Sequence, residues 1–240
     1  YEELINKYGV TRFWDWGVAI DGTDLNRLAR LLDLLNVGYV LAGHGAEDQG
    51  LPPGAESLTP LRMDGSDLVI AARRSGAWPR AFFVGRVEHH KGLAEFVTQL
   101  RESSGPFASI HVLDEGMADN VGSGFSRVNQ QQSDDPAVYE AATNYKLTAN
   151  RTSFRVHASG PGVAVLTEAW MANDFVATLN GDRVQYLRVN HAFKGVRIPG
   201  AGDWTVEFRY RPASWGISWI VAALGLLGVF FFPRALRAYA

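Results

Sequence analysis

The feature that most constrains this chain is an uncharged, apolar stretch near its C-terminal end, residues 213–232. As an α-helix rising about 1.5 Å per residue, a stretch of this length would extend for about 30 Å, the thickness of the hydrocarbon core of a bilayer. Trp215 and Trp219 lie at its front and Tyr239 follows it, and such aromatic side chains are typical of the headgroup layer. The sequence therefore predicts a transmembrane helix over residues 213–233 and a short tail over 234–240.

The composition is that of a mostly folded chain. Apolar residues make up 47% of its 240 residues and aromatic residues 12%, which is enough to bury a substantial core. The 23 basic and 25 acidic residues leave a net charge of -2, which argues against a nucleic-acid partner because such proteins neutralise many phosphates. The chain has no cysteine, so it forms neither a disulfide nor a thiolate metal site.

The first half alternates helix and strand patterns. The chain begins at Tyr1 without the basic and apolar regions of a signal peptide, so we expect an upstream portion. Helical spacing of leucines predicts a helix over residues 25–36 and branched residues predict a strand over 37–42. Further elements are expected at 68–72, 81–87 and 109–113 as strands and at 92–102 as a helix. Residues 1–135 are therefore predicted to form an α/β subdomain, which ends in a linker or long loop at 116–136.

From residue 136 the pattern changes to short alternating segments separated by turns. Strands are predicted at 144–149, 152–158, 162–167, 175–179, 183–189, 192–198 and 204–210. In the last of these, Val206 and Phe208 alternate with polar residues, as in a strand with one buried face. Asn180-Gly181 predicts a two-residue hairpin, because both positions tolerate a positive φ. Residues 136–212 are thus predicted to form an antiparallel β-sandwich, and the whole chain an α+β fold.

One loop of this β-rich part carries the residue types that bind carbohydrate. A sugar presents C–H faces and hydroxyl groups, so it is commonly bound by an aromatic side chain beside amides and carboxylates. The predicted substrate-binding residues combine this loop with a second turn that would lie beside it in a meander: Trp170, Asn173, Asp174, Phe175, Asn190 and His191. The alternative, which is the more common role of such aromatic residues, is that Trp170 and Phe175 close one end of the core.

Other polar clusters do not indicate an active site. Glu88-His89-His90-Lys91 suggests a metal or acid–base site, but consecutive side chains point in different directions, so a solvated loop is expected there. The Gly-x-Gly at 43–45 does not open into a helix, which argues against a phosphate site. Residues 122–124 lack the framing of a nucleophile elbow. We therefore predict no catalytic residue, no metal ligand and no cofactor within this sequence.

Three separated segments resemble one protein family. They are LLNVGYVL at 34–41, PRAFFV at 79–84, and the block at 163–212, which contains VNHAFKGVRIP and VEFRYRP. Together they resemble the C-terminal part of the YfhO family of bacterial polytopic membrane proteins, and the trailing apolar stretch agrees with this resemblance. The segment at 169–175 departs from the family pattern, because it keeps aromatic residues but lacks a Tyr-Pro-Gly-Trp-like corner.

The resemblance implies a function and a location. The family looks like the membrane glycosyltransferases of the GT-C type, which transfer a sugar from a polyprenyl-phosphate carrier on the extracytoplasmic side of the membrane. It implies that residues 1–212 lie outside the bacterial cell membrane, that residues 234–240 are cytoplasmic, and that the acidic catalytic residue lies outside this sequence. The expected partners are the lipid bilayer, upstream transmembrane helices of the same polypeptide, a polyprenyl-phosphate sugar and an acceptor glycan.

The apolar stretch also bears on the alternatives to this function. Ser218, Ala222 and Gly225 lie on one face of the predicted helix, and small residues let another helix approach closely. This favours the last of several membrane helices over a lone anchor. The alternative function is a non-enzymatic, membrane-anchored module of the bacterial envelope that binds carbohydrate or protein. A membrane-tethered hydrolase ranks last, because the sequence lacks a nucleophile with a neighbouring base.

Overall fold

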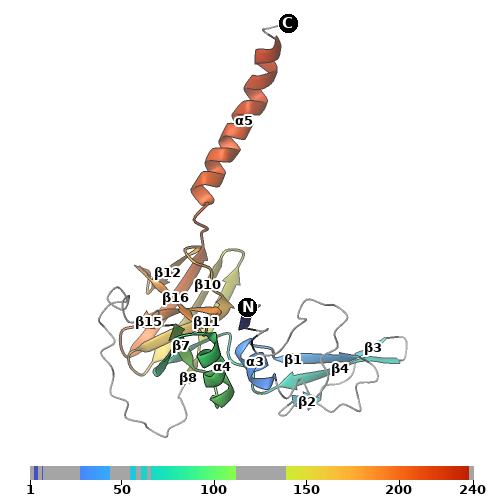
Figure 1. The fold of residues 1–240 in the computed structure, drawn as a ribbon, viewed down its shortest axis with the longest axis vertical. Helices are drawn as coiled ribbons and strands as arrows, with labels where there is room; N and C mark the ends of the chain where they lie inside the picture. Colours follow the sequence, from blue (N-terminus) through green and yellow to red (C-terminus); the bar gives the residue numbers. More distant parts are fainter. Residues whose placement is uncertain are drawn as a thin grey trace.

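A computed structural model describes residues 3–4, 7, 28–43, 55–57, 61–63, 66–111 and 139–237 of the chain. Its described part is mostly β-sheet with a few helices, which agrees with the predicted α+β class at that level (Figure 1). The elements up to residue 111 are α3 (Ala29–Leu34), β1 (Tyr39–Gly43), β2 (Ala55–Ser57), β3 (Leu61–Met63), β4 (Ser66–Arg74), β5 (Ala81–Val84), β6 (Val87–His90), α4 (Leu93–Glu102) and β7 (Ala108–His111). The elements from residue 139 on are β8 (Tyr139–Ala141), β9 (Thr143–Thr148), β10 (Arg151–Ala158), β11 (Gly162–Ala169), β12 (Phe175–Leu179), β13 (Asp182–Val184), β14 (Tyr186–Val189), β15 (Phe193–Ile198), β16 (Gly202–Tyr210) and α5 (Trp215–Arg237).

A seven-stranded sheet forms the centre of the molecule, in the order β6-β7-β14-β15-β11-β5-β8. Its strands come from both sides of the predicted boundary at residue 135, so the two predicted subdomains share one sheet. The pair β6 and β7 is parallel, and α4 makes the crossover between them, whereas the other pairs of this sheet are antiparallel. A smaller sheet, in which β4 pairs with β1, β2 and β3, holds the first strands of the chain.

Strands β5 and β11 lie inside the seven-stranded sheet and are buried on both faces. Phe82 and Val165 pack into the core on the helix side, whereas Phe83 and Ala164 pack into a second core on the other side. A strand covered on both faces has no polar side to display, which explains the continuous apolar runs in these segments. The structure confirms the strand predicted at 162–167 as β11, whereas the strand predicted at 81–87 is confirmed only as far as Val84, where β5 ends.

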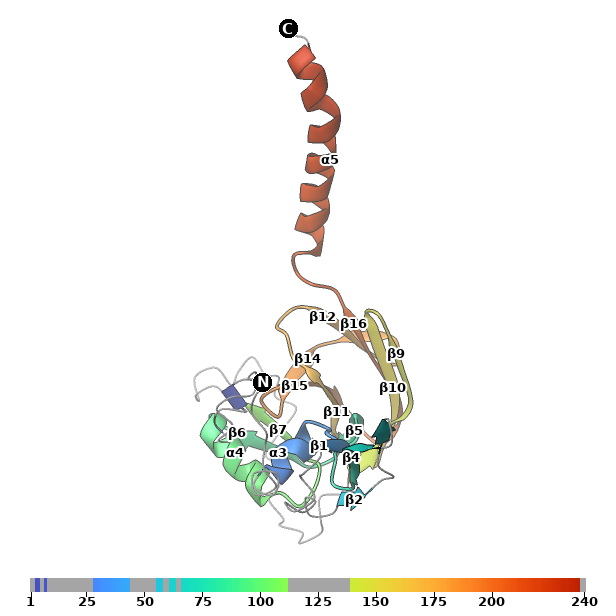
Figure 2. The same cartoon turned by 90° about the vertical axis from the view of Figure 1, so that its right-hand side faces the viewer.

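A five-stranded sheet, ordered β13-β12-β16-β10-β9, covers one face of the central sheet. The core between the two sheets includes Phe154 of β10 and Phe208 of β16, together with Ile198 of β15 from the opposite side. The alternation predicted for β16 is confirmed, because Val206 and Phe208 are buried while Arg209 is exposed. Figure 2 shows the strongly curved course of β9, β10 and β16.

Helices α3 and α4 pack on the other face of the central sheet. Leu31 and Leu34 of α3 and Phe96 and Leu100 of α4 join one core with Trp78. The prediction of α4 from its amphipathic pattern is confirmed to within one residue, whereas α3 covers only part of the predicted segment 25–36.

The segment Glu88-His89-His90-Lys91 corrects one prediction. It is not a solvated loop, because Val87–His90 forms strand β6 and the His90 side chain is buried. This short strand lies at the edge of the sheet, where it pairs in parallel with β7 and is covered by α4. These two neighbours stabilise β6 as a strand although its sequence is polar. The predicted loop at 116–136 and the Gly-x-Gly beyond Gly43 lie outside the described residues.

Helix α5 projects away from the β-rich part of the molecule (Figures 1 and 2). Side chains of this helix are described for residues 215–227 and for Val229, and the large apolar ones among them are exposed. Within the residues that the structure describes, no helix is both long enough and apolar enough to cross a membrane.

Candidate functional site

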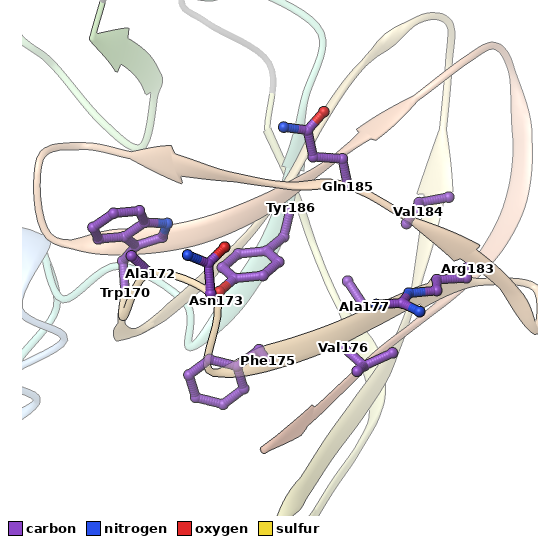
Figure 3. Close-up of a pocket in the computed structure, with 10 residues that line it drawn as sticks. All are labelled: Trp170, Ala172, Asn173, Phe175, Val176, Ala177, Arg183, Val184, Gln185 and Tyr186. Atoms are coloured by element: carbon purple, nitrogen blue, oxygen red, sulfur yellow. The ribbon is translucent and has the colours of Figure 1, made fainter. Parts of the chain in front are cut away.

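A pocket of about 590 Å³ is lined by residues within 170–177, which run from the loop after β11 into β12, and by residues 183–186 of β13 and the start of β14. Figure 3 shows Trp170 at one end of the lining residues, Arg183 at the other and Tyr186 between them. The lining combines three aromatic rings, small aliphatic side chains, two amides and one guanidinium group: Trp170, Ala172, Asn173, Phe175, Val176, Ala177, Arg183, Val184, Gln185 and Tyr186.

Local hydrogen bonds hold the 170–174 loop in place. The backbone N–H of Trp170 donates to the carbonyl of Ala192 at 2.8 Å, and the Tyr186 hydroxyl donates to the carbonyl of Met171 at 2.6 Å. Asn173 adopts a φ of 62°, a left-handed conformation that asparagine tolerates better than most residues. The loop therefore keeps a defined shape although it contains no regular structure.

Three of the predicted substrate-binding residues line this pocket together, namely Trp170, Asn173 and Phe175. Asp174 lies next to them but serves another contact, since its Oδ1 accepts a hydrogen bond of 3.3 Å from the backbone N–H of Ala213. Its carbonyl also accepts one of 2.7 Å from the N–H of Arg211. Asp174 thus joins the pocket loop to the segment that leads into α5.

Asn190 and His191 lie in the turn after β14 and do not line the pocket. The fully buried Asn190 amide accepts from the backbone N–H of Ser109 at 2.7 Å and donates to the carbonyl of Phe107 at 2.8 Å, so it joins the turn after β14 to the start of β7. The ring of His191 stacks on that of Phe96 with 6.4 Å between centroids. Burial, and then the charge of Arg188, lowers the pKa of His191.

The turn at 190–192 nevertheless helps to fix the position of Trp170 in the pocket. The guanidinium group of Arg188 lies 5.2 Å from the ring centroid of Trp170, and its Nε donates to the carbonyl of His191. Such a cation over an indole face is attractive. One face of Trp170 is therefore in contact with the protein, while the residue contributes to the pocket lining.

Sequence reasoning did not find Arg183, Gln185 and Tyr186. They reach the pocket because the Asn180-Gly181 hairpin folds β13 back along β12, with Ala177 opposite Val184. Asn180 and Gly181 have φ values of 51° and 94°, as the hairpin prediction requires. The predicted Asn180-Gly181 hairpin could have indicated that the residues just after it lie beside β12 and line the pocket.

A buried charge cluster lies behind Phe175 and was also missed. The Lys194 side chain is 1% exposed, and its Nζ lies 3.3 Å from Oε2 of Glu168 and 3.3 Å from the ring centroid of Phe175. Glu168 also accepts from the Tyr145 hydroxyl at 2.9 Å. Burial lowers the pKa of Lys194, and Glu168 opposes this shift; burial likewise raises the pKa of Tyr145. The cluster holds Phe175 from the protein side.

A second buried polar group lies under α4. The Ser109 hydroxyl donates to Oε1 of Gln99 at 2.8 Å, so the 2.8 Å contact between His90 Nδ1 and Ser109 Oγ has His90 as the donor. Its Nε2 is therefore unprotonated, and it is buried without a hydrogen-bond partner among the described residues. Burial, followed by the nearby His111 and His191, lowers the pKa of His90 to about 4.

The pocket is suited to binding through ring faces and hydrogen bonds. The side chains of Asn173, Arg183 and Gln185 form no hydrogen bond with another described residue, so they remain available to a ligand. Among the described residues, no group of three or more His, Cys, Asp or Glu side chains is arranged to hold a metal ion.

No protein-family model matches the chain, and no curated protein and no solved structure is significantly similar to it. Its function is therefore inferred from the pocket and from the sequence.

Proposed function

We propose that this chain is the extracytoplasmic part of a membrane glycosyltransferase-like protein, in which it binds or positions a glycan. The observation that carries the proposal is the pocket, in which Trp170, Phe175 and Tyr186 lie together with amide and guanidinium groups that form no hydrogen bond to another described residue. The sequence resemblance to the YfhO family supports the same function. The donor would be a polyprenyl-phosphate sugar and the acceptor a second glycan, and the catalytic residues would lie outside this chain.

The pocket chemistry matches a sugar in two ways. Aromatic rings supply flat apolar surfaces for the C–H faces of a pyranose, and amide groups such as those of Asn173 and Gln185 both donate and accept hydrogen bonds. The volume of about 590 Å³ falls in the usual range for small-molecule sites. The Tyr186 hydroxyl is engaged by Met171, so Tyr186 would contribute its ring and the shape of the loop.

The proposal includes a membrane location, which is taken from the sequence, because no helix within the described residues is long and apolar enough to cross a membrane. The segment 213–232 carries no charge, and the exposed apolar side chains of α5 include Ile217 and Leu224 on one side of the helix and Trp219 on the other. A helix that is apolar all round is stable when it is surrounded by other apolar material. A bilayer, with upstream transmembrane helices of the same polypeptide, would provide such surroundings for α5.

We interpret the five-stranded and seven-stranded sheets as the two layers of a β-sandwich, since Phe154 and Val206 from one sheet and Val196 from the other contribute to a common core. The pocket then lies at the end of the sandwich nearest α5, because Phe175 is paired with Tyr210, the last residue of β16.

Glycan binding by the full chain in lipid nanodiscs tests the proposal. Saturation-transfer NMR would be recorded with oligosaccharides of glucose, galactose and N-acetylglucosamine. Trp170→Ala and Asn173→Ala should each weaken binding about tenfold, which corresponds to about 1.4 kcal/mol. Lys146→Ala is the control, because this exposed residue lies on β9, at the opposite edge of the five-stranded sheet from β13.

The outcomes separate the candidate functions. Binding that is unchanged in both pocket variants would remove the pocket from the proposal. Glycan binding that depends on the pocket, in a complete protein that transfers no sugar from a polyprenyl-phosphate donor, would support the non-enzymatic envelope module instead.

A further inference from the structure

We propose that the end of the β-rich domain beside α5 is itself a membrane-docking surface that lies in the headgroup layer of the bilayer. This docking surface consists of Met171, Tyr210 and Arg211 together with Arg209. The inference rests on the proposed function in one respect, since it requires α5 to be inserted in the membrane.

The first support is the apolar exposure at this end of the domain. Met171 is 39% exposed and Tyr210 is 41% exposed, although both are large and apolar. The exposed Trp215 follows at the first turn of α5, with its ring centroid 6.2 Å from that of Trp219. Tyrosine and tryptophan are enriched where a membrane meets water, because their rings are apolar at one end and polar at the other.

The second support is the short tether between the domain and α5. Strand β16 ends at Tyr210 and α5 begins at Trp215. The four residues between them extend for at most about 14 Å when fully stretched. The end of β16 therefore lies within this distance of the start of α5, so it stays close to the bilayer surface if α5 is inserted.

The third support is that the tether is fastened to the pocket loop. Asp174 accepts hydrogen bonds from the backbone N–H groups of Arg211 and Ala213, and the backbone N–H of Trp215 donates to the carbonyl of Pro212 at 3.0 Å. These contacts orient the loop relative to the start of α5. Met171 is held in the same loop through its carbonyl, which accepts from the Tyr186 hydroxyl. The loop and the tether thus present one continuous surface.

Charge favours a bilayer that contains anionic lipid. Arg209 and Arg211 are exposed at this end, and Glu207 is the nearest acidic partner of Arg209, at 3.9 Å. Glu207 is also paired with Arg151, and Asp174 of the pocket loop adds a second carboxylate, so Arg151, Arg209 and Arg211 outnumber Glu207 and Asp174 by one charge. A basic side chain near an anionic membrane surface contributes about 1 kcal/mol to its attraction.

The docking surface defines what can reach the pocket. Ala172 and Asn173 line the pocket and directly follow Met171 in the chain. If Met171 lies among the lipid headgroups, the pocket opens at the membrane surface and takes ligands that are themselves attached to, or adsorbed on, that surface.

Site-directed fluorescence tests the inference, and the absence of natural cysteine allows single labels. The full chain would be reconstituted in vesicles of phosphatidylcholine and phosphatidylglycerol with an NBD label at Met171→Cys. The matched control is Asp182→Cys, an exposed position in the hairpin at the far end of β12. A third label at Ile220→Cys reports insertion of α5. We expect a blue shift and quenching by shallow doxyl lipids at position 171, neither at position 182, and quenching by deep doxyl lipids at position 220.

Each result decides one part of the inference. Quenching at position 220 with none at position 171 would overturn the docking surface while leaving the membrane span intact. No quenching at position 220 would overturn the proposed span and the docking with it.

Asp174→Ala should reduce the quenching at position 171, whereas Asp174→Asn, which keeps a side-chain oxygen for the Ala213 N–H, should retain it. Replacing Arg209 and Arg211 by glutamine should weaken quenching at position 171 on anionic vesicles and leave position 220 unchanged.

Discussion

Lowering the pH from 7 to 5 should destabilise the folded domain through His90. This side chain is 1% exposed, and its Nε2 has no described partner. The charged or titratable groups around it are His111 of β7, Glu95 of α4, Arg188 of β14 and His191 of the following turn. Burial opposes the protonated form of His90 most strongly, the two histidines and Arg188 also oppose it, and only Glu95 among these groups favours it.

The size and sign of the effect follow from the two pKa values. The pKa of His90 is about 4 in the folded chain and 6.5 in the unfolded chain. Its neutral form therefore stabilises the fold above pH 6.5, and this contribution is lost as the pH falls towards 4. The full loss is about 3 kcal/mol, of which about 2 kcal/mol falls between pH 7 and pH 5.

Urea unfolding of the full chain in a non-ionic detergent would measure this loss, with intrinsic tryptophan fluorescence as the signal. Trp78 is a suitable reporter because it is buried in the same core as Phe96, which packs against His90. His90→Asn keeps a donor for Ser109 and removes the titration, so it should lose about 2 kcal/mol less than the natural chain between pH 7 and pH 5. His89→Gln, at an exposed position of the same strand, is the control. Equal losses in the natural chain and in His90→Asn would refute the reasoning.

Two further predictions concern the central sheet. A Cβ at Gly162 would meet the Phe83 ring at 2.6 Å and collide with the carbonyl of Val84, whereas Gly160 has open space around it. Gly162→Ala should therefore lower the free energy of unfolding by about 1–3 kcal/mol, and Gly160→Ala should leave it nearly unchanged in the same urea assay. Glu168→Gln should cost about 3 kcal/mol because it leaves the Lys194 ammonium group buried without its anion, while Lys194→Met should cost less, about 1 kcal/mol. Equal urea midpoints in either pair of variants would contradict the corresponding prediction.

Much of the local structure could be predicted from the sequence. The amphipathic pattern of α4, the alternation of Val206 and Phe208 in β16 and the Asn180-Gly181 hairpin all agree with the structure. These features depend on residues that are close in the chain, because helical and strand periodicity and turn preferences act over a few positions. The short polar strand β6 was missed because α4 and the parallel partner β7 stabilise it, and neither is visible in its own sequence.

The candidate site was predictable only in part. Trp170, Asn173 and Phe175 are close together in the sequence and meet in the pocket. Asn190 was expected beside them, but its amide bonds to the backbone of Phe107 and Ser109, and these contacts depend on the pairing of β14 with β7. Tyr186 was not predicted as a pocket residue, because it reaches the pocket only after the hairpin folds β13 back along β12.

The sequence alone determined the positions of most strands and the apolar segment at 213–232, because hydrophobic periodicity and a lack of charge are properties of contiguous residues. The tertiary structure decided that strands from both halves of the chain share one sheet, and that Lys194 is buried against Glu168. It also placed Asp174 on the tether to α5. These outcomes depend on which strand edges and side chains meet across large separations in the chain, and strand pairing over such distances is set by the packing of the whole core.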